Sequence, residues 1–170
     1  MQNSSSPVAT PTLKRRLICL VYEAFLVVAV AALAVFVFMF VMQKVDRGIV
    51  EKGSGIFAFI VVGAYFIHSW SGSGFTLAMK TWRIKIVRVG YARVPFRNSA
   101  IRYVFSWGWV LPGGLIYYVA GIHNWKAMSL SMLSGAILWG LTAFLDKDRQ
   151  FLHDRLAGTR LISLPKPVKK

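Results

Sequence analysis

The feature that most constrains this chain is a long apolar run at residues 17–42, which contains a single carboxylate, Glu23. About 20 apolar residues are enough for a helix to cross a bilayer, so this run predicts a transmembrane helix. It is too long for the apolar part of a secretory signal, and Glu23 also argues against one. A carboxylate inside such a helix is costly, so its position calls for a physical reason.

The composition points to the same class of protein. The chain has 170 residues, of which 56% are hydrophobic, and it carries 21 Lys and Arg against 6 Asp and Glu. A soluble domain of this size could not bury so much apolar surface, and the long apolar runs exclude a soluble nucleic-acid binder. We therefore predict an all-α membrane protein with basic flanking segments and no nucleic-acid partner. The single Cys19 excludes an internal disulfide.

Four apolar segments predict four transmembrane helices. They cover about residues 17–42, 54–70, 101–122 and 127–145. The link between the last two is short, so these two segments are expected to form a helical hairpin. Residues 1–13 are rich in Ser, Thr and Pro and predict a disordered tail, residues 14–162 form the membrane domain, and residues 163–170 form a basic tail.

The distribution of basic residues predicts the orientation. Seventeen of the 21 Lys and Arg lie in the two terminal segments and in the link between the second and third predicted helices. The positive-inside rule then places both termini in the cytoplasm of a multi-pass protein of the cell (inner or plasma) membrane. A basic cytoplasmic face also predicts contact with anionic lipid headgroups.

The segment that follows the second predicted span has its own pattern. "GFTLAMKT" is compatible with a short helix at the membrane interface, and residues 83–89 then alternate between basic and β-branched side chains. Such alternation predicts a strand, and "GTRLISL" near the C-terminus is a possible partner for it. The alternatives are a small cytoplasmic β-ribbon and an irregular basic loop on the headgroups.

Motifs of catalysis and metal binding are weak. His68, His123 and His153 lack the spacing of zinc ligands. "GFTLAMKT" has the spacing of a P-loop, but Met79 takes the place of the glycine that lets the backbone wrap a phosphate. We therefore expect no enzymatic activity, no cofactor and no metal centre.

Glu23 lies about 9 Å along the first helix from its apolar start, at 1.5 Å rise per residue. The third predicted span begins on the same side of the membrane, so Arg102 is the expected partner. With Arg16 and Asp154, these residues predict a polar cluster at the cytoplasmic rim. Arg97, Asp146 and His153 are secondary candidates. Three roles are open for Glu23: it forms a structural ion pair, it belongs to an ion or substrate site, or its side chain reaches the surface without a partner.

"WVLPGGLIY" interrupts the third predicted span near its middle. Pro112 removes a backbone donor and kinks a helix. Broken helices can mark transporter sites, although ordinary kinks have the same cause.

Several stretches resemble the RDD family of small multi-pass bacterial membrane proteins. They are "RRLICLVYE", "GFTLAMKTWRIKIVRVG", the arginine of "NSAIRYV" and "FLHDRLAGTRLI", and together they extend over residues 15–162. By motif position, the family arginine corresponds to Arg16 and the last aspartate to Asp154. The first aspartate falls on Glu23, which keeps the charge and adds a methylene. The family pattern "GQTLGK" stands here as "GFTLAMK".

The resemblance implies a membrane protein for which transport or ion exchange is one suggestion, with no defined cofactor. Two functions are therefore considered. The first is transport or exchange of a small ion or solute, with a small cation or solute as ligand and a homo-oligomer as a possible assembly. The second is a non-transporting membrane scaffold or regulatory subunit that acts through its basic cytoplasmic face.

Overall fold

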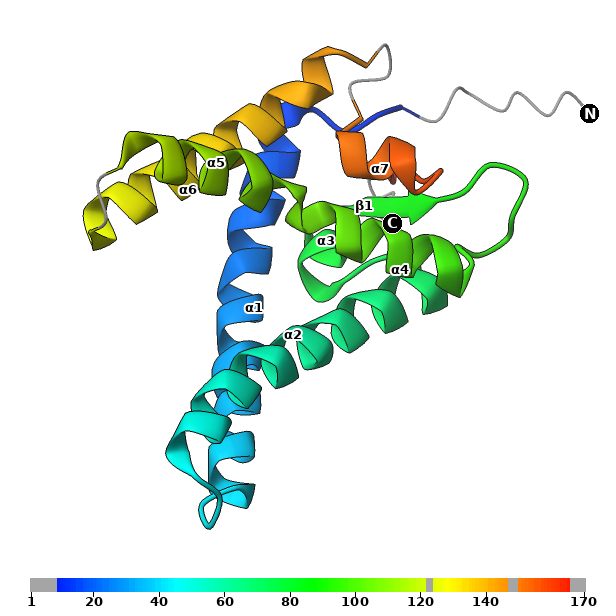
Figure 1. Ribbon diagram of the computed structural model, residues 1–170. Coiled ribbons are helices and arrows are strands. Elements are labelled where there is room, and N and C mark those ends of the chain that lie inside the picture. Colours follow the sequence, from blue (N-terminus) through cyan, green and yellow to red (C-terminus); the bar gives the residue numbers. More distant parts are fainter. Residues whose placement is uncertain (1–8, 122–123, 147–149, 166–170) are drawn as a thin grey trace, which may run out of the picture. The chain divides into compact units, whose positions relative to one another are not determined.

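The computed structural model describes residues 9–121, 124–146 and 150–165 (Figure 1). The chain forms two compact units. The first contains Met1–Lys85 and Ile162–Lys170, and the second contains Ile86–Leu161.

Two long helices dominate the first unit. Helix α1 (Leu13–Val41) and helix α2 (Arg47–Gly72) pack along one another as a helical hairpin with a short link (Figure 1). Each helix begins at a side-chain cap, because the Thr12 hydroxyl accepts from the Arg15 amide and the Asp46 carboxylate accepts from the Gly48 amide. The cap explains why α2 starts at Arg47, seven residues before the predicted span.

A short helix and a two-stranded sheet follow. Helix α3 (Leu77–Thr81) packs on α1 and is capped by Thr76, whose hydroxyl accepts from the Met79 amide at 3.3 Å. Strand β1 (Ile84–Val87) then pairs with strand β2 (Arg160–Ser163). The predicted β-ribbon is therefore confirmed, and alternate residues of β1 are buried, as a period of two requires.

The second unit is built from shorter helices. They are α4 (Phe96–Ser106), the 3₁₀ turn η1 (Trp107–Trp109), α5 (Val110–Ala120), α6 (Trp125–Leu141), the 3₁₀ turn η2 (Thr142–Phe144) and α7 (Leu152–Leu156). Helices α5 and α6 form the predicted hairpin (Figure 1). Their backbones approach closely where Gly113 faces Gly135, and a Cβ on Gly135 would lie 2.5 Å from the Gly113 nitrogen.

The predicted third span, residues 101–122, is not one continuous α-helix. Its described part runs through α4, η1 and α5, and the 3₁₀ turn lies one helical turn before Pro112. The physical reason is the proline itself, because Pro112 has no N–H to donate to the carbonyl of Gly108 in η1. Pro112 therefore occupies the first turn of α5, where a missing N–H is tolerated.

Three helices within the described residues are long and apolar enough to cross a membrane. They are Leu13–Val41, Arg47–Gly72 and Trp125–Phe144. They overlap the first, second and fourth predicted spans. The prediction of four transmembrane helices is thus supported for three segments.

Candidate functional site

The buried carboxylate of Glu23 is the centre of the polar contacts in the first unit. Glu23 lies on α1 and is only 8% exposed. The Thr76 hydroxyl donates to its Oε2 at 2.5 Å, and the Tyr65 hydroxyl lies 3.4 Å from its Oε1. Both carboxylate oxygens therefore face neutral hydroxyl groups, which can act as donors or acceptors.

The two hydroxyls come from different local structures. Tyr65 lies in the interior of α2, on the face that packs against α1. Thr76 lies in the short non-helical segment between α2 and α3, which Gly74 permits by adopting a left-handed φ of 81°. This segment places Thr76, which is 2% exposed, against Glu23 and caps α3 at the same time.

Two arginines at the start of α1 have separate roles. Arg16 is buried, and its Nε donates to the Pro11 carbonyl at 3.0 Å. Arg15 points to the β-ribbon: its guanidinium donates to the Ser163 hydroxyl at 2.7 Å and to the Trp82 carbonyl at 2.5 Å. The first turn of α1 is thereby fixed to the ends of both strands.

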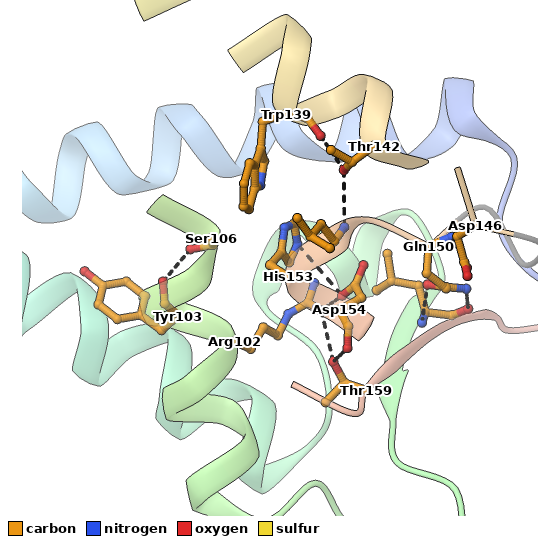
Figure 2. A network of polar contacts seen from close by, with 12 residues as sticks. Arg102, Tyr103, Ser106, Trp139, Thr142, Asp146, Gln150, His153, Asp154 and Thr159 are labelled. Atoms are coloured by element: carbon orange, nitrogen blue, oxygen red, sulfur yellow. Dashed lines mark hydrogen bonds and ion pairs between the residues drawn. The ribbon is translucent and has the colours of Figure 1, made fainter. Parts of the chain in front are cut away.

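A second polar network lies in the other unit (Figure 2). The Arg102 guanidinium on α4 forms an ion pair with the Asp154 carboxylate on α7, and Asp154 is fully buried. Arg102 Nη1 also donates to the Thr159 hydroxyl at 3.3 Å. The helix α7 ends just before Gly158, whose left-handed φ of 62° turns the chain so that Thr159 reaches this pair.

His153 borders the ion pair. Its Nε2 lies 3.8 Å from Asp154 Oδ1, and its ring stacks on Phe151. Burial lowers the pKa of His153 well below its ordinary value, and the nearby Arg102 charge lowers it further. The Asp154 carboxylate would favour the protonated ring, but its charge is already compensated by Arg102, so burial decides the direction and His153 is neutral at pH 7.

The other predicted residues of this unit lie outside the ion pair. Asp146 accepts from the Gln150 amide and pairs with the exposed Arg155. Arg97 is exposed on α4. The Gln150 side chain pairs with the backbone of Leu161, which lies in β2.

The predicted cluster of Arg16, Glu23, Arg102 and Asp154 thus divides between two units. Arg102 and Asp154 meet within one unit. Arg16 and Glu23 belong to the other, and the pairing of Glu23 with Arg102 stays a prediction.

The sequence does not predict Tyr65, Thr76, Thr159 or Gln150 as site residues. Two of them have a local sequence signature: Thr76 precedes a short helical pattern, as an N-cap does, and Thr159 follows the turn glycine in "LAGT". Tyr65 and Gln150 have none, because their partners are set by tertiary contacts.

A family model supports the resemblance: the model of the RDD family matches residues 10–158. The chain belongs to the RDD family. No curated protein and no solved structure matches the chain significantly. Arg16, Glu23 and Asp154, which the resemblance assigns to the RDD motif positions, lie in the matched range and are buried. Family membership and the three apolar helices together indicate a membrane protein.

Proposed function

We propose that this RDD protein is a multi-pass membrane transporter or exchanger of a small ion or solute, with Glu23 as the ion-binding group. One observation supports the proposal above others. Among the described residues of its own unit, Glu23 is held by the hydroxyls of Tyr65 and Thr76 and by no cation.

A buried carboxylate without a compensating charge is unfavourable in an apolar environment. It becomes stable when it takes up a proton or binds a cation. Hydroxyl groups suit both states, because each can accept a hydrogen bond from a protonated carboxyl and can turn an oxygen lone pair to a bound cation. The three side chains of Glu23, Tyr65 and Thr76 together offer only oxygen atoms, which are the ligands that hard cations prefer.

The backbone next to Glu23 is compatible with such a role. The helical structure is interrupted between Gly72 and Leu77, and Thr76 comes from this interruption. Transporter sites are often formed where helices are broken, because the freed backbone groups and the helix ends can face a ligand. In the proposed orientation both termini lie in the cytoplasm of the cell membrane, which is what the bias of Lys and Arg favours.

A second candidate function is a membrane scaffold or regulatory subunit. It is favoured by the absence of a polar relay in the described α5–α6 hairpin. Apart from Tyr117 and Tyr118, α5 has no ionisable side chain, and α6 has none after Lys126. The buried pair of Arg102 and Asp154 fits a structural role equally well.

Ion flux in sealed vesicles separates the two candidates. Internal pH is followed after imposing a sodium or potassium gradient on vesicles that contain wild type, Glu23→Gln, Thr76→Val or Glu51→Gln. Glu51 is the matched control, because it is an exposed acid near the start of α2. We expect cation-dependent proton flux in wild type and in Glu51→Gln, reduced flux in Thr76→Val, and none in Glu23→Gln.

Two results would count against transport through Glu23. Folded wild type without flux for either cation across several pH values would favour the scaffold. Flux that persists unchanged in Glu23→Gln would remove Glu23 from the pathway.

A further inference from the structure

Several basic side chains lie at one end of the first unit. They belong to the start of α1, to helix α3 and to the residues before β1. Arg15 connects these segments, because its guanidinium donates to the carbonyls of Trp82 and Arg83. Lys14 is the neighbour of Arg15 in sequence. The Arg83 amide donates to the Lys80 carbonyl at 3.2 Å, so a single turn joins these two residues.

Arg83 has an unusual backbone. Its φ of 53° is left-handed, and among the described residues it is the one residue other than glycine with a positive φ. A side chain makes this conformation unfavourable, and glycine would adopt it without strain. The carbonyl of Arg83 accepts from the Leu164 amide at 2.9 Å and from Arg15 at 3.3 Å, so the surrounding structure enforces the strain. The presence of an arginine at a position suited to glycine motivates the hypothesis that its side chain has a role.

The basic side chains at this end have no acidic neighbours in their unit. Lys14 and Lys80 are exposed and Arg83 is half-buried. Among the described residues, none of these three side chains makes a hydrogen bond or an ion pair. Glu23 is buried, and the other two acids of the unit lie where α2 begins, at the opposite end of α1 from Lys14: Asp46 is the N-cap of α2 and Glu51 follows in its first turns. Among the described residues of this unit, no acidic side chain therefore compensates this positive charge.

Two further features place this surface at the boundary of a membrane. The apolar run of α1 begins at residue 17, directly after the basic residues. The rings of Tyr22 and Trp82 meet edge to face at 5.8 Å, and Tyr and Trp are the residues enriched at the level of the lipid headgroups. On α3, the exposed Leu77 lies three residues before Lys80, so an apolar and a basic side chain share one face.

We propose that Lys14, Lys80 and Arg83 form a binding surface for the phosphate of an anionic phospholipid headgroup. The guanidinium of Arg83 would provide paired donors to phosphate oxygens, and the two lysines would add compact positive charges. Tyr22, Trp82 and Leu77 would contact the adjoining glycerol and acyl region. Bound lipid would stabilise the contact of α1 with the β-ribbon. This role is independent of whether Glu23 moves ions.

The test measures the thermal unfolding midpoint of the full chain in a neutral detergent. Phosphatidylglycerol, phosphatidylcholine with the same acyl chains, or glycerol 3-phosphate is added in increasing amounts. Wild type is compared with Arg83→Gly and with the double variant Lys14→Gln/Lys80→Gln. The control is Lys44→Gln/Lys52→Gln, which removes two exposed lysines from the opposite end of the hairpin.

We expect phosphatidylglycerol, and neither of the other additives, to raise the midpoint of wild type and of the Lys44/Lys52 control. Both test variants should lose at least half of that rise. Without lipid, Arg83→Gly should unfold at or above the wild-type midpoint, because glycine relieves the left-handed strain. This result would separate a loss of binding from a loss of folding.

Three results would overturn the proposal. The first is an equal rise in all variants. The second is an equal rise with phosphatidylcholine, which would show that the headgroup charge is not recognised. The third is an equal rise with glycerol 3-phosphate, which would identify a site for soluble phosphate esters. If Arg83→Gly does not fold, the lysine double variant alone decides between these outcomes.

Discussion

Replacing Asp154 by Asn is expected to destabilise the protein strongly. Asp154 is fully buried and Arg102 is nearly so, with side-chain exposures of 0% and 7%. The Asn variant would leave the Arg102 charge buried beside Thr159, whose neutral hydroxyl cannot compensate it. Breaking a buried ion pair in this way costs about 3–5 kcal/mol of unfolding free energy.

A matched control is available on the same helix. The side chain of Arg155 is 71% exposed and pairs with Asp146 at 3.4 Å, so Arg155→Gln should cost at most about 1 kcal/mol. The free energy of unfolding is measured by titration with a denaturing detergent in mixed micelles. The double variant Arg102→Met/Asp154→Leu removes both charges and should recover most of the loss. A cost for Asp154→Asn as small as that for Arg155→Gln would refute the assignment of a sealed, structural ion pair.

Three further predictions use the same assay. Gly135→Ala should lower the free energy of unfolding by about 1–3 kcal/mol, because the new Cβ meets the Gly113 backbone at 2.5 Å. Gly140→Ala, with nothing within 4 Å of its Cβ, should raise it by about 0.5–1 kcal/mol through helix propensity, and equal effects would show that the helices are not in close contact. Gly158→Ala should lose about 1–2 kcal/mol through its left-handed φ of 62°, and an unchanged stability would contradict that conformation. Because the pKa of His153 is lowered in the folded protein, the unfolded chain binds more protons than the folded one. Wild type should therefore lose stability relative to His153→Gln as the pH falls below 6.5, and parallel curves of stability against pH would exclude a buried neutral ring.

Local patterns in the sequence were sufficient for much of the secondary structure. The apolar runs predicted α1, α2 and α6, because helix formation in an apolar environment depends on the length and composition of one segment. The alternation at residues 83–89 predicted β1, and "GTRLISL" predicted its partner β2. The predicted third span was less accurate, because it is not one continuous α-helix. Pro112 has no N–H to donate, and the helix becomes the 3₁₀ turn η1 one turn before it.

The candidate site divides in the same way. The sequence by itself singled out Glu23 and Asp154, because a carboxylate in an apolar helix and a distinctive motif are visible without a structure. It did not provide the partners of Glu23, since Tyr65 and Thr76 lie 42 and 53 residues further along the chain. Hydroxyl residues are common, and only the packing of α2 and α3 on α1 selects these two. The sequence therefore determined which segments are helical and where charge is costly, and the tertiary structure decided how each charge is satisfied, because that depends on contacts between distant segments.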